Sequence, residues 1–280
     1  MMYQVMYVFY LLAGLTYGAG IVFAIKQSRS TTKRLSWAAF FFLLAGFLTG
    51  MIMMASTWIE MGQPPFRTLY QSLIFFSVTT VVVYLFAGKR SILLGFGTSL
   101  FILAVLAYGY IRRDTGTIYL PPALQSFWFV PHVLVYFLGY SALFISFVAS
   151  VFQLVFPKPR QLPAAELLGI KEINFNAFTY RAVVFGFAMI SSGLIMGALW
   201  AKFAWGDWWS WDPKENWALI TWFIYAGYLH LRFIPEVKAK ALSWVSVVGF
   251  LVLMFTYLGV NYLPMAQDTL HSYQNEYMNK

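Results

Sequence analysis

The stretch WAAFFFLLAGFLTGMIMMASTWI, residues 37–59, is an apolar run without a charged residue. A helix rises about 1.5 Å per residue, so this run is long enough to cross a hydrocarbon core of roughly 30 Å. Backbone amides surrounded by lipid must pair within their own segment, which favours a helix. The strict alternation that a membrane barrel needs is absent. The stretch therefore predicts a transmembrane helix.

Seven further blocks of the chain are also predominantly apolar. They cover residues 4–24, 70–87, 92–110, 128–155, 182–204, 217–233 and 242–262. The 280 residues are 60% hydrophobic and 10% charged, against about 25% charged in an average soluble domain. A soluble core cannot bury that much apolar surface. The predicted fold is all-α, a polytopic membrane bundle of about eight transmembrane helices that forms a single integral membrane domain over residues 1–280.

The charged residues are divided unevenly between the two sets of connections. The connections after the first, third, fifth and seventh blocks lie on one side of the predicted bundle and hold 13 of the 19 Lys and Arg residues with three acidic residues. The connections and tails on the other side hold six basic and seven acidic residues. Under the positive-inside rule, this predicts both termini outside. The longest basic connection, residues 156–180, contains ELLGIK at 166–171, which predicts a short helix on the inner surface.

Composition also excludes several kinds of chemistry. The chain has no cysteine, which excludes a structural disulfide, a cysteine-ligated metal and a thiol nucleophile. The net charge of +9 is explained by topology and by contact with the anionic lipid bilayer. It therefore gives no case for nucleic acid as a partner.

The densest signal is the segment 205–217, WGDWWSWDPKENW, on the predicted outer side. Seven of the 11 tryptophans of the chain lie between Trp200 and Trp222. An aromatic belt is the commonest use of interfacial tryptophan. A belt needs neither a glycine hinge nor a consecutive pair, however, so this cluster favours a rigid apolar platform for a large flat ligand such as a porphyrin.

The end of the tryptophan segment has a structural explanation of its own. Asp212 stands at a helix N-cap position, Pro213 suits the first helical position, and Glu215 follows three residues after Asp212. Together these residues form a capping box. The sequence predicts that Asp212 and Glu215 begin the seventh helix, and neither needs a catalytic role.

Two of the three histidines fall on the side predicted to carry the tryptophans. His132 lies at the outer start of the fifth block, and His271 lies in the outer tail, residues 263–280. Each alone is more often an interfacial polar residue than a metal ligand. As a pair they favour haem, because two neutral imidazoles on opposite faces of the ring can ligate its iron.

The third histidine, His230, is predicted to lie toward the inner leaflet. It falls roughly 20 Å below the outer start of the seventh block at about 1.5 Å per residue. An ionisable group inside a membrane is a functional candidate by default. The alternative is a neutral histidine that is hydrogen-bonded to a neighbouring helix or lies near the inner headgroups beside Arg232. Both interpretations stay open, and a single histidine there would need a second ligand from another chain.

These motifs resemble a known family. Residues 205–212, WGDWWSWD, are similar to the W-G-x-W-W-x-W-D (WWD) signature of haem-handling proteins of cytochrome c biogenesis. The continuation 213–222, with Tyr228-Leu229-His230, resembles the CcsA (ResC) branch of system II, which the segments 270–273 and 70–72 also fit. Gln71 departs from the glutamate expected in that branch, and the variable position of the signature holds Asp207.

The resemblance implies a function. Haem is moved from the cytoplasmic side to an outer site, where thiols of an apocytochrome c CxxCH motif add to its vinyl groups. Haem b would be the transported group, and His230 would ligate it in transit. The implied outer site consists of the iron ligands His132 and His271 and the haem-lining residues Trp205, Trp208, Trp209, Trp211 and Asp212.

The same resemblance implies partners and a location. The chain would be a subunit of a holocytochrome c synthase (haem lyase), incomplete without a CcsB (ResB) membrane subunit that supplies the second ligand opposite His230. Apocytochrome c would be the client, and a thioredoxin-like thiol reductant a further partner. The location implied is the bacterial cytoplasmic membrane, or the thylakoid membrane of a plastid.

Three alternatives differ from this interpretation. A CcmC-type haem chaperone shares the signature and delivers haem to a carrier, but it has about six spans. A membrane-bound b-type electron-transfer cytochrome would need ligand pairs inside the bundle, where the sequence offers only His230. A secondary transporter would need intramembrane acids, which the apolar blocks lack.

Overall fold

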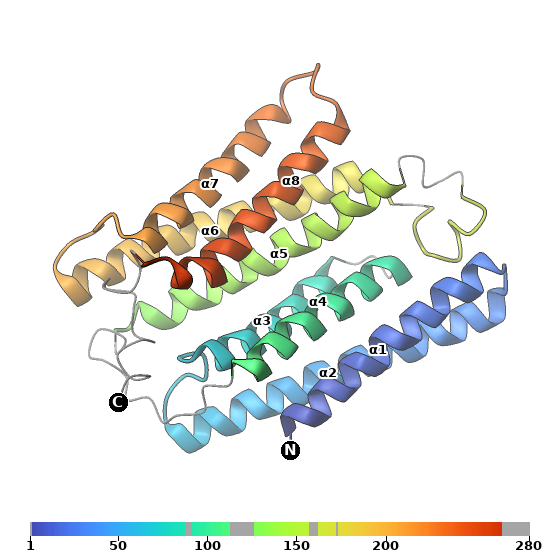
Figure 1. The fold of residues 1–280 in the computed structure, drawn as a ribbon, viewed down its shortest axis with the longest axis horizontal. Coiled ribbons are helices and arrows are strands. Elements are labelled where there is room, and N and C mark those ends of the chain that lie inside the picture. Colours follow the sequence, from blue (N-terminus) through green and yellow to red (C-terminus); the bar gives the residue numbers. More distant parts are fainter. Residues whose placement is uncertain (1, 88–90, 113–125, 157–161, 172, 265–280) are drawn as a thin grey trace. The chain divides into compact units, whose positions relative to one another are not determined.

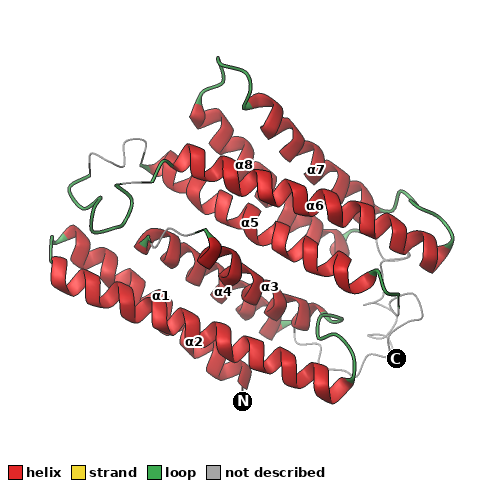
Figure 2. Cartoon of the chain, turned by 180° about the vertical axis from the view of Figure 1, so that it is seen from behind, coloured by secondary structure: helices red, strands yellow, loops and turns green. Residues whose placement is uncertain are grey.

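The computed structural model describes residues 2–87, 91–112, 126–156, 162–171 and 173–264. Within these ranges the chain is helical and has no strand (Figures 1 and 2). The helices are α1 (Met2–Ile25), α2 (Arg29–Met61), α3 (Leu69–Phe86), α4 (Ile92–Ile111), α5 (Phe129–Val155), α6 (Phe175–Trp205), α7 (Pro213–Leu231) and α8 (Ala239–Met254). A π-helical turn, Phe255–Gly259, and a 3-10 turn, Val260–Tyr262, continue α8. The predicted all-α class is confirmed.

Several helices are longer than the apolar blocks that predicted them. α2 begins at Arg29 rather than at residue 37, and α6 begins at Phe175 rather than at residue 182. Hydropathy marks only the part of a helix that lies in hydrocarbon, whereas backbone hydrogen bonds continue beyond it. The true helix ends therefore lie among charged and polar residues that the apolar pattern does not include.

Seven of the described helices are long and apolar enough to cross a membrane. They are α1 to α6 and the continuous helix Ala239–Tyr262. α7 forms the predicted helix but is not among the seven, because its first turn carries Lys214, Glu215 and Asn216. The polytopic membrane bundle is thus confirmed, and the eighth span stays a prediction.

The chain divides into two compact units. Unit 1 comprises Met1–Ile118 and Val151–Phe178, and unit 2 comprises Tyr119–Ser150 and Thr179–Lys280. Unit 1 therefore contains α1 to α4, and unit 2 contains α7, α8 and most of α5 and α6. A single domain over residues 1–280 and the external position of both termini remain predictions.

In unit 1, tyrosines of α1 fill places that glycines leave open on the neighbouring helices. A Cβ added to Gly46 of α2 would lie 3.0 Å from the Tyr10 ring, and one added to Gly95 of α4 would lie 2.4 Å from Cζ of Tyr17. Both tyrosines are fully or almost fully buried. Small residues that let a neighbour approach closely are typical of helix contacts in membranes, where lipid is as apolar as the core.

The connection between α5 and α6 belongs to unit 1 and corrects one prediction. Residues 166–171 form turns rather than the predicted short helix, and Gly169 adopts a left-handed φ of 70°. The Leu168 carbonyl accepts hydrogen bonds from Oγ of Ser91 at 3.1 Å and from the Ile92 N–H at 3.2 Å. This carbonyl satisfies an N–H group of the first turn of α4, which has no partner within its own helix. If residues 166–171 formed a helix, the Leu168 carbonyl would instead accept a hydrogen bond from within that helix.

In unit 2, side-chain hydrogen bonds join each of the four helices to its two neighbours. The pairs are Ser150–Thr179 (α5–α6, 3.5 Å), Ser191–Trp222 (α6–α7, 2.8 Å), Thr221–Thr256 (α7 and the continuation of α8, 2.9 Å) and Ser146–Ser246 (α5–α8, 3.1 Å). Short polar side chains commonly join membrane helices in this way. These bonds fix which helices are neighbours in unit 2.

We predict that Gly95→Ala destabilises unit 1, because the new methyl group would overlap the Tyr17 ring. Overpacking of this kind typically costs about 1–3 kcal/mol. Gly18→Ala on α1 is the matched control, since its Cβ would meet Phe96 at an ordinary 3.5 Å. Thermal unfolding of the two variants in the same detergent measures the difference. Equal stability of both variants would contradict this packing.

Candidate functional site

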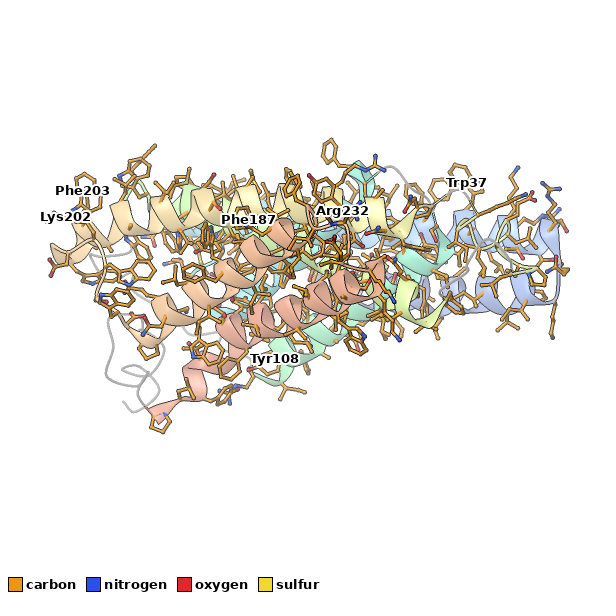
Figure 3. All side chains as sticks on the ribbon, turned by 90° about the horizontal axis from the view of Figure 1, so that it is seen from above. Trp37, Tyr108, Phe187, Lys202, Phe203 and Arg232 are labelled. Atoms are coloured by element: carbon orange, nitrogen blue, oxygen red, sulfur yellow. The ribbon has the colours of Figure 1, made fainter. Side chains whose placement is uncertain are left out.

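The WWD segment, residues 205–217, connects α6 to α7 and leaves α6 through a glycine turn. Gly206 has a left-handed φ of 90°, which a glycine adopts without strain. Its carbonyl accepts a hydrogen bond of 2.5 Å from Nζ of Lys202. Figure 3 shows Lys202 and Phe203 at this end of α6, whereas Arg232, just after α7, lies far from them. The turn sends the chain from the end of α6 into residues 207–212.

The other end of the WWD segment is held by the predicted capping box. Oδ1 of Asp212 accepts from the Glu215 N–H at 2.8 Å, and Oε2 of Glu215 accepts from the Asp212 N–H at 3.3 Å. Pro213 occupies the first turn. The cap prediction is confirmed. A role of Asp212 toward a ligand stays a prediction.

Glu215 and Asn216 also hold the residues just before the helix. Oε2 of Glu215 accepts from the Ser210 N–H at 2.8 Å, and Nδ2 of Asn216 donates to the Trp211 carbonyl at 2.8 Å. Trp211 has a φ of 59°, which is rare for a bulky residue and costs of order 1–3 kcal/mol. Such strain persists only where surrounding contacts enforce it, and these hydrogen bonds are such contacts.

Lys214, just before the predicted span, lies beside the cap. Partial burial lowers the pKa of the Lys214 ammonium, and the Asp212 carboxylate raises it in opposition. The Asp212 carboxylate therefore stabilises the charged form of Lys214 in this poorly hydrated position.

The indoles of the segment do not form one flat sheet. Trp208 and Trp211 are 54% and 68% exposed, and Trp209 is half-buried. Trp209 and Trp211 meet at 6.0 Å with their planes nearly perpendicular. Trp205 instead contacts the buried Trp200 at 5.3 Å. The four predicted haem-lining indoles therefore present faces in several directions, two of them open to the surroundings.

His132 lies in the first turn of α5 against the backbone of α6. Its Nδ1 is 2.9 Å from the Gly193 carbonyl. A carbonyl can only accept, so Nδ1 carries the proton and the lone pair of the ring belongs to Nε2. A Cβ on Gly197 would lie 2.8 Å from Cε1 of His132, so the ring occupies space that only a glycine leaves open.

Two aromatic rings complete the surroundings of His132. The Tyr136 ring lies 4.8 Å and the Trp200 ring 5.6 Å from the imidazole, measured between centroids. We call Gly193, Gly197, Tyr136 and Trp200 the His132 seat. Metal-ligating histidines usually donate their second ring N–H to a carbonyl or carboxylate, which fixes tautomer and orientation. The His132 seat has this arrangement.

His230 lies at the far end of α7, one residue before the helix ends. Seventeen residues separate it from Pro213, a rise of roughly 26 Å along the helix. Nδ1 of His230 is 2.9 Å from the Ala226 carbonyl of the same helix, so Nε2 again carries the lone pair. The side chain is exposed, and Arg232 follows it and lies over the Tyr180 ring at 5.3 Å. His230 therefore lies at the end of α7 opposite the WWD segment, and its place toward the inner leaflet stays a prediction.

His271 lies outside the described residues, as does the rest of the tail from residue 265. The structure therefore does not test the predicted pairing of His132 with His271. It separates His132 from His230, which lie at opposite ends of unit 2: His132 is in the first turn of α5, beside the end of α6 that leads into the WWD segment, and His230 is in the last turn of α7.

Comparison with known proteins identifies the family. A family profile described as cytochrome C assembly protein matches residues 66–266. The chain belongs to this family. It is 32% identical to the cytochrome c biogenesis protein CcsA of Guillardia theta, over 94% of this chain and 92% of that protein. It is also 34% identical to the CcsA protein of Chlamydomonas reinhardtii, over 80% of this chain and 64% of that protein.

These relatives make the chain a CcsA-type protein, a multi-pass membrane protein of a bacterial cytoplasmic or thylakoid membrane with a haem-handling role in cytochrome c biogenesis. Its fold is similar to a solved structure, the cytochrome c haem lyase CcmF, with a TM-score of 0.59 and 18% identity. The match covers 92% of this chain and 46% of that chain, so the chain spans less than half of CcmF. At that identity the similarity shows the fold alone.

Sequence reasoning missed the His132 seat of this CcsA-type chain. The signal was present, because Gly193 and Gly197 are spaced as a small-xxx-small pair that lets membrane helices approach closely. Trp200 was noticed only as one of the clustered tryptophans, although it is buried and contacts both His132 and Trp205. Only the pairing of α5 with α6 shows which residue fills the space beside these two glycines.

The structure also explains the departure at Gln71. Its side chain accepts from the Thr68 N–H at 3.5 Å while Oγ1 of Thr68 accepts from the Gln71 N–H at 3.1 Å, a capping box at the start of α3. Glutamine and glutamate both perform this function. The substitution therefore preserves the helix start without an acidic group.

We predict that Asp212→Asn keeps the α7 cap and that Asp212→Ala loses it, because asparagine caps as well as aspartate. Loss of such a cap costs about 0.5–2 kcal/mol. Thermal unfolding in detergent compares the two variants with the unchanged protein. A stable Asp212→Asn variant that no longer binds haem would show that the charge, and not the cap, is what the site needs.

Proposed function

We propose that this CcsA-type chain binds haem at an extracytoplasmic site and presents it for covalent attachment to the CxxCH motif of apocytochrome c, as a subunit of a holocytochrome c synthase. The hydrogen bond from Nδ1 of His132 to the Gly193 carbonyl carries this proposal. It gives the imidazole the tautomer and the fixed orientation that an iron ligand needs. Haem b is the cargo of the reaction rather than a resident cofactor.

The tryptophans of the WWD segment would supply the surface for the porphyrin. Trp205, Trp208, Trp209 and Trp211 offer apolar ring faces, and Trp208 and Trp211 are the exposed ones. Large flat aromatic surfaces bind one another with little loss of side-chain freedom. In this proposal Asp212 contributes through the cap that supports Trp211, and Nε2 of His132 ligates the iron.

The chain contributes position rather than a nucleophile. It contains no cysteine, so the attacking thiolates belong to the client, and a thioredoxin-like reductant keeps them reduced. The two sulfurs add to the vinyl groups while the protein holds the ring at the reacting distance. Correct positioning alone can supply a large part of such a rate enhancement.

Two further histidines complete the proposal. His271 would be the second axial ligand at the outer site. His230, exposed at the other end of unit 2 with its lone pair on Nε2, would ligate haem in transit from the cytoplasmic side. A CcsB-type membrane subunit would supply the ligand opposite His230. Both termini of the chain would lie outside, on the side of the WWD segment.

We predict that His132→Ala abolishes covalent haem attachment to a CxxCH reporter, because the iron loses its positioned ligand. The protein level should not change, and added imidazole should restore haem binding. The measurements are the haem absorption spectrum of the purified complex and haem staining of the reporter. Normal maturation of the reporter in this variant would refute the assignment of His132. If the unchanged protein kept its haem and never transferred it to the reporter, the chain would instead be a b-type cytochrome.

We predict that His230→Ala lowers haem loading at the outer site, because haem from the cytoplasmic side loses its ligand in transit. Haem added to right-side-out membranes or to the detergent-solubilised complex should bypass the defect, because it reaches the outer site directly. Lys238→Ala, in the connection after α7, is the control for a general effect at that end of unit 2. Unchanged loading in His230→Ala would leave His230 as a headgroup-side histidine without a haem role.

A further inference from the structure

We propose that haem in transit lies flat against one exposed face of α7, with Gly227 beneath the porphyrin and Phe223 against its edge. This inference rests on the proposed function, because it assumes that His230 ligates the iron. It adds the residues that receive the ring and the orientation in which the ring is held.

Phe223, Gly227 and His230 share one face of α7. They are spaced as i, i+4 and i+7, which places them one above the other along the helix. Phe223 is 60% exposed, and the His230 side chain is exposed as well. A Cβ added to Gly227 would meet no atom within 4 Å. The part of the chain that the structure describes therefore leaves this face of α7 uncovered.

Gly227 differs from the other helical glycines whose surroundings the structure describes. At each of those, an added Cβ would come within 4 Å of a neighbouring side chain. At five of them it would lie 3.0 Å or less from an aromatic ring, in the pairs Gly46–Tyr10, Gly95–Tyr17, Gly193–Tyr136, Gly197–His132 and Gly249–Tyr225. A glycine inside a helix is less favourable than alanine, and in this chain it makes room for a flat ring. We infer that the ring over Gly227 comes from outside the chain.

The His230 imidazole is directed toward this open place. Its Nδ1 donates to the Ala226 carbonyl at 2.9 Å, and a helical side chain covers the turn that precedes its own Cα. The lone pair of Nε2 points away from that carbonyl, and a porphyrin is perpendicular to the bond between its iron and the ligating nitrogen. A haem bound to Nε2 therefore extends along the surface of α7. One helical turn is about 5.4 Å, so the ring reaches over Gly227, where a larger side chain would collide with it.

Phe223 supplies an aromatic surface one turn further along the same face. Its ring meets the Trp222 ring at 5.3 Å with an angle of 80° between the planes. Trp222 is itself held by a hydrogen bond of 2.8 Å from its Nε1 to Oγ of Ser191 on α6. Phe223 is thus supported from the side while its outer face stays open to a second flat ring.

The combination of features favours haem over a docked transmembrane helix. A glycine on an apolar face would suit either occupant, since small residues also admit a neighbouring helix. Only a metal-bearing ring uses the glycine, the exposed phenyl ring and the lone pair of the His230 nitrogen together.

The experiment uses the complex purified with its membrane partner subunit and carrying His132→Ala, so that the outer site does not contribute. Haem is titrated into the haem-depleted complex, and the low-spin bis-imidazole spectrum reports binding at α7. We expect Gly227→Ala to weaken haem binding about 10-fold, because the added methyl group displaces the ring. Gly227→Leu should abolish binding. Ile220→Leu, on the same exposed face seven residues before Gly227, is the control and should bind haem normally.

A second pair of variants tests the aromatic contact. Phe223→Leu keeps an apolar side chain but removes the ring, so we expect haem binding to weaken roughly 3-fold to 10-fold. Phe223→Tyr keeps the ring and should bind haem as the unchanged residue does. Equal binding by the leucine and tyrosine variants would contradict the contact between Phe223 and the porphyrin.

Thermal unfolding of the haem-depleted complex separates a lost contact from a damaged helix. Alanine is a better helix former than glycine, so Gly227→Ala should unfold no earlier than the unchanged complex although it binds haem more weakly. Normal haem binding by Gly227→Leu would overturn the proposal. Loss of the partner subunit from Gly227→Leu during purification would overturn it in favour of a docked helix. If the His132→Ala complex binds no haem before α7 is changed, the transit role of His230 in the proposed function is refuted instead.

Discussion

The close approach of α5 and α6 is the contact on which the rest of unit 2 depends. Gly139 and Gly186 bring the two backbones together, and Gly193 and Gly197 continue that face of α6 toward the WWD segment. In lipid, helices gain little from burying apolar surface against each other, so close packing and hydrogen bonds must supply the association. The same glycines that allow this packing create the space that His132 occupies. The packing of α5 on α6 and the position of His132 are therefore not separable.

The WWD segment illustrates how a capping motif can serve a second purpose. Asp212 and Glu215 begin α7 as any capping box would. Glu215 and Asn216 extend their hydrogen bonds to Ser210 and Trp211 as well. The result is a left-handed tryptophan with an exposed indole, held in a conformation that an unsupported loop would leave. The start of α7 thus supports the strained backbone of Trp211 and fixes the position of its aromatic surface.

The two described histidines share a tautomer but differ in restraint. Both direct Nδ1 at a backbone carbonyl, and in both the lone pair is on Nε2. The partner of His132 belongs to another helix, and aromatic rings surround the imidazole, whereas the partner of His230 belongs to the same helix and its side chain is exposed. The proposed outer ligand is thus the restrained histidine, and the proposed transit ligand is the exposed one.

The sequence by itself determined the helical membrane class, the approximate position of the spans, the start of α7 at Asp212 and the family resemblance carried by the WWD residues. These features depend on neighbours along the chain, because hydropathy, capping and motif spacing are local properties. Sequence reasoning predicted a helix at 166–171, where the Leu168 carbonyl instead bonds to the start of α4. Only the tertiary structure decided that Gly193 and Gly197 pack against His132, because a glycine has no side chain whose chemistry indicates which residue lies beside it. The identity of that neighbour is set by the pairing of α5 with α6, which brings together Nδ1 of His132 and the Gly193 carbonyl, 61 positions apart in sequence.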